Sequence, residues 1–153
     1  CSAVSLSGPA AGIITDGHFG EAEITEIDTA RIRKELAAGR AVVVAGFQGA
    51  APSGDVATLG RGGSDTSAVA LAAALGADIC KIYTDVDGVY TADPRRDPTA
   101  AKLDSISYDE MLAMAKSGAQ VLHPRAVELA KKHRVRVEVL SSFTDAPGTV
   151  LTE

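Results

Sequence analysis

The segment that most restricts the fold of this chain is residues 59–77, LGRGGSDTSAVALAAALGA. Its second half is almost purely apolar and predicts a buried helix over residues 64–75, ended by Gly76. Its first half places Arg61 among three glycines, which adopt positive φ readily and let other groups approach the backbone closely. Ser64 and Asp65 favour the cap of a helix, whose free N–H groups and dipole attract anions. The segment predicts an anion-binding turn before a buried helix; a tight turn without a ligand is the alternative.

Strand and helix patterns alternate along the chain. The run AVVVA at residues 41–45 is typical of a strand that is buried on both faces. Alternating elements predict an α/β fold, a three-layer α/β/α sandwich around a mainly parallel sheet. The predicted strands cover residues 12–16, 22–27, 41–45, 78–84 and 135–140, with a further strand near residue 150; the predicted helices cover residues 29–38, 64–75, 107–116 and 124–132.

Two long polar loops follow predicted strands, at residues 46–63 and 85–100. Ligands of parallel sheets bind beyond the carboxyl ends of the strands, so both loops are candidate binding segments. Carboxylates near amides that bind phosphate favour a magnesium–nucleotide complex and phosphoryl transfer. Turn formation is the alternative role of each aspartate, above all at Asp87-Gly88. The two loops and the helix start that follows the first of them carry carboxylates at Asp55, Asp65, Asp85, Asp87 and Asp93, with Arg61, Arg95 and Arg96 between them.

Composition excludes several classes of function. A net charge of −5 argues against nucleic acid as a partner, and the longest apolar stretch is too short to span a bilayer. Cys1 and Cys80 lack the spacing of a disulfide framework or a zinc site, so no metal-ligating protein cluster is predicted. We expect a cytoplasmic protein with no membrane partner.

Three long motifs closely resemble the catalytic domain of the aspartate kinase family, within the amino acid kinase superfamily. DGVYTADP alone is less specific, because uridylate kinases and glutamate 5-kinases carry a similar segment. The motifs GRGGSDTSA and VLHPRAVE together point to the aspartate kinases. The matching segments are TLGRGGSDTSAVALAAALGAD, IYTDVDGVYTADPR and VLHPRAVELA, with GIITD, VVVAGFQG and SSFTDAPGT in addition.

This resemblance implies that ATP, with Mg²⁺, phosphorylates the side-chain carboxylate of L-aspartate to give 4-phospho-L-aspartate. That reaction is the first step toward lysine, threonine and methionine. By motif, Arg61 and Ser64 resemble the substrate-binding pair, and Asp65 resembles the catalytic acid that organises active-site cations. The nucleotide contacts of the family correspond to Thr84, Asp85, Tyr90, Arg95 and Gln120, the last replacing a lysine of many relatives.

The chain departs from the family pattern at both ends. The family's lysine- and glycine-rich phosphate loop, a substrate-binding glutamate and the ACT regulatory domains have no counterpart in residues 1–153. We therefore expect the C-terminal part of an amino acid kinase catalytic domain, without the N-terminal strands and inactive by itself. Homo-oligomerisation or association with the rest of the enzyme is expected. A kinase with a different acceptor and a non-catalytic nucleotide-binding fragment are the alternatives.

Overall fold

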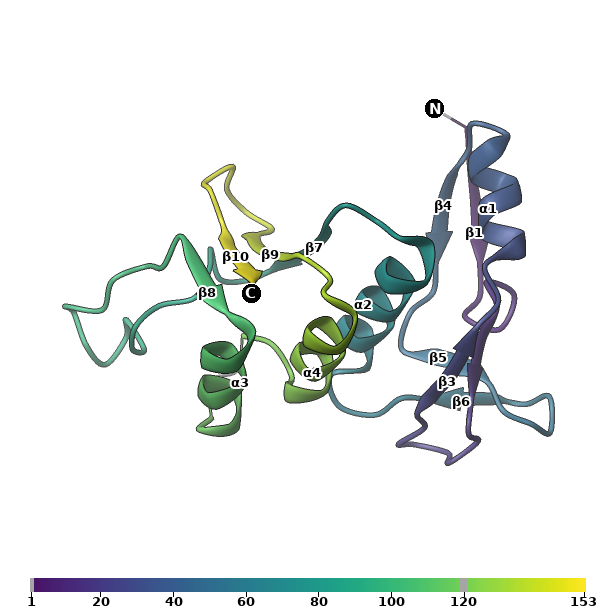
Figure 1. Cartoon of the computed structure of the whole chain (residues 1–153), viewed down its shortest axis with the longest axis horizontal. Coiled ribbons are helices and arrows are strands. Elements are labelled where there is room, and N and C mark those ends of the chain that lie inside the picture. Colours follow the sequence, from purple (N-terminus) through teal and green to yellow (C-terminus); the bar gives the residue numbers. More distant parts are fainter. Residues whose placement is uncertain (1, 119–120) are drawn as a thin grey trace. The chain divides into compact units, whose positions relative to one another are not determined.

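The computed structural model describes residues 2–118 and 121–153, which form an α/β fold of strands and four helices (Figure 1). The chain divides into two compact units, of which the first ends at Gly76 and the second begins at Ala77. The predicted α/β class is confirmed, with sheets that are parallel or mixed. Among the described residues, no helix has both the length and the apolar character needed to cross a membrane.

The first unit contains two sheets and two helices. Strand β1 pairs in parallel with β4, and the second sheet has the order β3-β2-β5-β6. In that sheet β2 is parallel to β5, whereas β3 and β6 are antiparallel to their neighbours. The elements are β1 Ala3–Leu6, β2 Ile13–Thr15, β3 Ile24–Ile27, α1 Ala30–Ala37, β4 Ala41–Val44, β5 Gln48–Ala50, β6 Val56–Thr58 and α2 Gly63–Leu75.

Apolar side chains of α1, α2 and β4 form one core of this unit. Val42 and Val44 pack against a buried cluster that includes Ile32, and Leu71 of α2 joins them. Val43 points the other way and is 58% exposed, so the prediction that this strand is buried on both faces is wrong. Alternating side chains of a strand point to opposite faces, and the described residues cover only one face of β4.

Helix α1 buries a charged residue and exposes an apolar one. Leu36 is exposed, while Glu35 is buried and accepts hydrogen bonds from Arg31 Nε at 2.9 Å and Arg40 Nη1 at 2.5 Å. Burial raises the pKa of Glu35, but the charges and hydrogen bonds of the two arginines outweigh it and lower the pKa. The carboxylate therefore stays ionised beneath its two partners.

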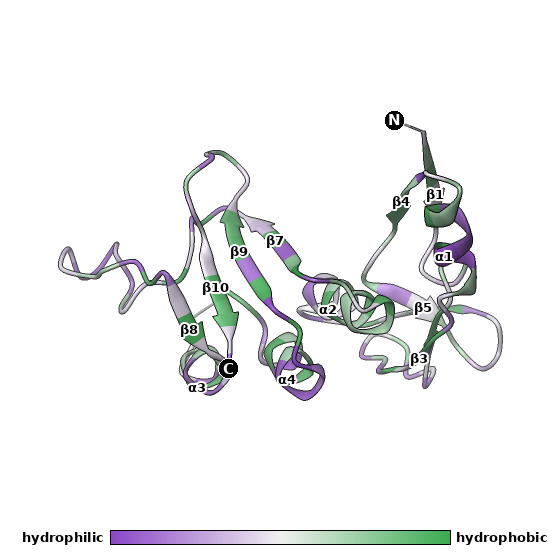
Figure 2. Ribbon diagram, turned by 45° about the horizontal axis from the view of Figure 1, so that its top comes forward, coloured by the Kyte–Doolittle hydropathy of each residue, from purple (hydrophilic) through white to green (hydrophobic). Residues whose placement is uncertain are grey.

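The second unit is a mixed sheet in the order β7-β9-β10-β8, accompanied by two helices. Strand β9 is parallel to β7 and antiparallel to β10, which is parallel to β8. Buried Val137, Val139 and Leu151 form its core, and Figure 2 shows hydrophobic residues along both β9 and β10. The elements are β7 Cys80–Thr84, β8 Ser105–Ser107, α3 Tyr108–Lys116, α4 Pro124–His133, β9 Val137–Ser141 and β10 Thr149–Thr152.

The predicted loop at residues 46–63 contains a short hairpin, β5–β6. Its strands pair Gln48 with Thr58 and Ala50 with Val56. A Cβ at Gly49 would lie 2.7 Å from Cγ2 of Thr15 in β2, so the glycine permits the close approach of these neighbouring strands. The hairpin shortens the free part of the loop to the residues nearest α2.

The capping box of α3 predicts a local contribution to stability. Ser107 Oγ accepts a hydrogen bond from the Glu110 N–H at 3.2 Å, and the Glu110 carboxylate accepts one from the Ser107 N–H at 3.0 Å. We expect Ser107→Ala to lower the free energy of unfolding by about 1 kcal/mol, because the first turn loses its cap. Denaturant unfolding followed by circular dichroism measures this, with a substitution of the exposed Ser105 of β8, Ser105→Ala, as control. Equal losses in the two variants would contradict the capping role.

Candidate functional site

The turn before α2 is built on glycines in the left-handed region. Gly60 has φ of 74° and Gly62 has φ of 70°, and Gly62 is the N-cap residue of α2. The prediction that Ser64 or Asp65 caps the helix is therefore wrong, since the turn requires a left-handed residue at the cap. Both residues lie instead in the first turn of α2.

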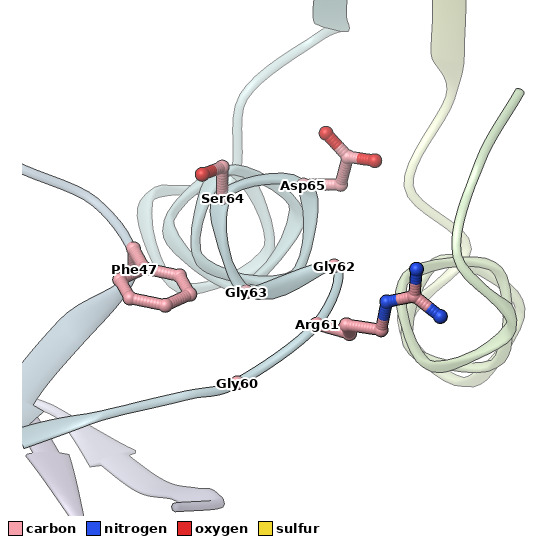
Figure 3. A pocket seen from close by; sticks show the side chains of 7 residues that line it. All are labelled: Phe47, Gly60, Arg61, Gly62, Gly63, Ser64 and Asp65. Atoms are coloured by element: carbon pink, nitrogen blue, oxygen red, sulfur yellow. The ribbon is translucent and has the colours of Figure 1, made fainter. Parts of the chain in front are cut away.

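A pocket of about 310 Å³ opens at this turn, lined by Phe47 and residues 60–65 (Figure 3). Arg61 is exposed, and it forms no ion pair with the residues that the structure describes. Its side chain and the Phe47 ring lie on opposite sides of the glycine turn in Figure 3. Ser64 is exposed and Asp65 is half-buried. The structure thus places Arg61, Ser64 and Asp65 at one turn, and their roles in binding and catalysis stay predictions.

The glycines at this pocket are required by close packing. A Cβ on Gly63 would lie 2.8 Å from both Leu59 Cβ and Phe47 Cδ2. A Cβ on Gly60 would lie 2.6 Å from the carbonyl oxygen of Gly20, in the loop between β2 and β3. Three chain segments therefore meet at the start of α2 because no side chain separates them.

Phe47 lines the pocket and Ser67 binds its backbone, and the sequence analysis predicted neither role. Phe47 has φ of 69°, a strained value for a residue with a side chain. Its N–H donates to Ser67 Oγ at 3.1 Å, and Ser67 Oγ donates to the Ser64 carbonyl at 2.9 Å. Ser67 is 1% exposed, so its hydroxyl is a buried link between this turn and α2. The only sequence signal was Gly46 beside Phe47 at the end of a strand.

The β2–β3 loop beside Gly60 is held by Asp16. Its carboxylate accepts hydrogen bonds from the backbone N–H of His18 and of Glu23, both at 3.1 Å, and contacts His18 Nδ1 at 2.9 Å. These hydrogen bonds, led by the His18 backbone N–H, lower the pKa of Asp16 to about 2. The carboxylate is therefore ionised at neutral pH and serves to order the loop.

A second group of predicted site residues lies on the long loop after β7. Thr84 ends β7 and donates through Oγ1 to Asp85 Oδ1 at 3.2 Å, with the Asp85 side chain exposed. Tyr90 is half-buried, and its hydroxyl donates to Asp87 Oδ1 at 3.0 Å. Backbone pairing of Tyr90 with Lys102 narrows the loop into a hairpin-like extension. Thr84, Asp85 and Tyr90 therefore belong to one segment of the second unit.

Other predicted acidic residues serve local turns. Asp55 accepts a hydrogen bond from Ser53 Oγ at 2.9 Å, and Asp93 accepts one from the Arg95 N–H at 2.9 Å. Arg95 lies at the exposed tip of the loop, with its Nε 3.5 Å from Asp93 Oδ1. Gln120 lies outside the described residues. Among the described residues, no cluster of three or more histidine, cysteine, aspartate or glutamate side chains could hold a metal ion.

Comparison with known proteins links these segments to one family. The sequence pattern of the amino acid kinase family matches residues 1–141. The chain is 59% identical over 151 residues to an aspartokinase of Geobacillus stearothermophilus, covering 99% of this chain and 37% of the relative. It is 58% identical over 142 residues to an aspartokinase of Thermus thermophilus, covering 93% of this chain and 35% of the relative.

A solved structure shows the same fold with ligands. The E. coli aspartokinase III in complex with aspartate and ADP superimposes with a TM-score of 0.86 at 36% identity. The match covers 99% of this chain and 35% of that one. The chain thus spans little more than a third of the length of these relatives.

The buried hydroxyl of Ser67 gives a prediction for the pocket. We expect Ser67→Ala to lower the free energy of unfolding by about 1–3 kcal/mol, because the Phe47 N–H loses its acceptor in a buried place. Ser64→Ala, one turn earlier on an exposed position, is the control and should lose less. Chemical denaturation of both variants measures the difference. A Ser67→Ala variant as stable as the unaltered protein would show that the link does not hold the turn.

Proposed function

The chain belongs to the amino acid kinase family, and we propose that, as part of a larger catalytic unit, it transfers the γ-phosphoryl group of ATP to the side-chain carboxylate of L-aspartate, giving 4-phospho-L-aspartate. The observation that carries this proposal is the exposed Arg61 beside Ser64 in the glycine-turn pocket, a cation that forms no ion pair with any residue that the structure describes. Close identity to aspartokinases, and a similar structure that holds aspartate and ADP, support both substrates.

Arg61 and Ser64 would bind the acceptor. A guanidinium presents parallel N–H donors that match the two oxygens of a carboxylate. The Ser64 hydroxyl would add a further donor on the same turn, and the positive end of the α2 dipole favours an anion there. The glycine turn fixes the backbone on both sides of Arg61. No acidic side chain among the described residues forms an ion pair with Arg61, so none competes with a substrate carboxylate there.

The loop after β7 would bind the nucleotide through Thr84, Asp85, Tyr90 and Arg95. Phosphoryl transfer needs positioning and neutralisation of charge more than covalent help from the protein. Mg²⁺, when bound with the nucleotide, would supply part of that neutralisation of phosphate charge. It usually keeps several waters and takes only one or two carboxylates, which fits the absence of a three-residue acidic cluster among the described residues. Asp65 would supply such a carboxylate.

The same activity places the protein at the first step toward lysine, threonine and methionine. A cytoplasmic setting, where ATP and L-aspartate are available, goes with this proposal. Association into homo-oligomers, or with further segments of the enzyme, is proposed as well. The match to little more than a third of each aspartokinase supports a role as part of a larger catalytic unit.

Two alternatives give different results in a simple assay. A family member with another acceptor would release ADP with that acceptor and not with L-aspartate. A non-catalytic nucleotide-binding module would bind ATP without any acceptor-dependent release of ADP. A coupled assay across amino acid and nucleotide acceptors separates these cases from the proposed reaction.

Arg61→Ala tests the acceptor site. In the intact protein we expect KM for aspartate to rise about ten- to a hundredfold, since a charge-assisted contact contributes about 1.5–3 kcal/mol. KM for ATP should change far less. Arg61→Lys keeps the charge but lacks the planar guanidinium, so its KM for aspartate should lie between those of the unaltered protein and Arg61→Ala. Steady-state kinetics with each substrate varied decide the matter, and equal effects on both KM values would contradict the assignment of Arg61.

Asp85→Ala tests the nucleotide site. The side chain is exposed at the end of β7, so its loss should leave the fold intact. We expect weaker binding of a non-hydrolysable ATP analogue in titration calorimetry, with an unchanged melting temperature. Asp55→Ala, which removes a turn-forming carboxylate from the first unit, serves as the control. Unchanged affinity in Asp85→Ala would contradict the assignment of Asp85 to the nucleotide site and leave it only a local role at the end of the strand.

A further inference from the structure

Three polar side chains of the loop after β7 form a connected group, made up of Tyr90, Asp87 and Lys102. Tyr90 Oη donates to Asp87 Oδ1 at 3.0 Å. Lys102 Nζ lies 3.5 Å from the other carboxylate oxygen of Asp87, and it donates to the Pro147 carbonyl at 2.5 Å. Asp87 therefore lies between a phenol and a cation, with each of its oxygens facing one of them.

We propose that Asp87 and Lys102 are positioning residues that fix Tyr90 so that it meets the nucleotide with its ring and not with its hydroxyl proton. The proposal rests on the function proposed above, in which Tyr90 contacts ATP. Its basis is the direction of the hydrogen bond. A phenol has a single proton, and here that proton is given to Asp87.

Electrostatics supports the arrangement. Although burial raises the pKa of Asp87, the Tyr90 hydrogen bond and the Lys102 charge outweigh it and lower the pKa. The hydrogen bond to Asp87 is also the main cause of the raised pKa of Tyr90. Asp87 is thus an anion and Tyr90 a neutral phenol at pH 7, so the proton stays on the tyrosine.

Lys102 has a second effect on an anionic ligand. A lone carboxylate on the nucleotide loop would repel the phosphates of ATP. The Lys102 cation, held by the Pro147 carbonyl, offsets the charge of Asp87. Tyr90 can then be held by a strong acceptor while the loop gains no net negative charge at that point.

The loop has its own anchor, which allows the side-chain effect to be measured separately. Thr149 Oγ1 accepts a hydrogen bond from the Val89 N–H at 2.8 Å and donates to the Leu103 carbonyl at 2.6 Å. The Leu103 N–H donates to the Val89 carbonyl at 2.9 Å. These bonds hold the backbone next to Tyr90 and next to Lys102. Removal of the Asp87 side chain should therefore free the Tyr90 ring and leave the backbone of the loop in place.

The test is a set of variants of the intact protein, measured for binding of a non-hydrolysable ATP analogue and for both KM values. We expect Asp87→Ala and Tyr90→Phe each to weaken analogue binding about five- to tenfold, the loss of one hydrogen bond, and KM for aspartate to stay unchanged. Asp87→Asn keeps an acceptor and should lose less. Tyr90→Ala, which removes the ring, should lose more than Tyr90→Phe.

Double variants and controls complete the design. Asp87→Ala in a Tyr90→Phe background should cost little more than either change alone, because the two act through one bond. Lys102→Met should weaken analogue binding, because the charge of the Asp87 carboxylate is then no longer offset. Lys102→Arg keeps the positive charge and should bind the analogue normally. Asp87→Ala combined with Lys102→Met removes both charges and should recover part of the affinity that Lys102→Met loses. Asp104→Ala, on the same loop, is the control and should bind normally. Melting temperatures exclude unfolding as a cause.

Distinct outcomes separate this inference from the proposed function. No binding of the analogue by the unaltered protein would overturn the proposed function, and this inference with it. Normal binding by both the unaltered protein and Asp87→Ala would overturn this inference alone. Equal losses in Tyr90→Phe and Tyr90→Ala would also overturn it, because the hydroxyl and not the ring would then make the contact.

Discussion

The close packing at the start of α2 is the constraint on which the proposed acceptor pocket depends. Gly63 lies against Leu59 and Phe47, and Gly60 lies against the Gly20 carbonyl, at distances that no Cβ could share. The turn between these glycines projects Arg61 into solvent while its backbone is held on both sides. An arginine on an ordinary flexible loop would lose more conformational entropy on binding a carboxylate.

In each unit a buried hydroxyl holds the loop that carries proposed site residues. In the first unit, Ser67 joins the Phe47 turn to the first turn of α2. In the second unit, Thr149 joins both sides of the loop that carries Tyr90 to the start of β10. Ser67 and Thr149 are almost fully buried, and the hydroxyl of each both donates and accepts a hydrogen bond. Loops that carry function are thereby fixed by the regular elements behind them.

Local signals in the sequence were sufficient for some elements and not for others. The starts of α3 after Ser107 and of α4 at Pro124 depend on neighbouring residues, and the helices predicted over residues 107–116 and 124–132 agree with them. Ser67 and Phe47 are twenty residues apart, and nothing in either segment announces their contact. The exposed face of β4 likewise depends on which elements cover it. Strand β1, in which Ser5 separates Val4 from Leu6, was not predicted. Long motifs suggested Arg61 and Tyr90 as site residues, but only the structure shows that the Tyr90 hydroxyl donates to Asp87.

The most direct test of the proposed reaction is to trap its product. A carboxyl phosphate reacts with hydroxylamine to give a hydroxamate, whereas phosphate esters and free phosphate do not. Incubation of the intact protein with ATP, Mg²⁺, L-aspartate and hydroxylamine should give the side-chain hydroxamate of aspartate in an amount equal to the ADP released. The hydroxamate should fall with the ADP when Arg61 is replaced by alanine. Release of ADP without aspartate hydroxamate, or its formation only with another carboxylic acceptor, would contradict the account.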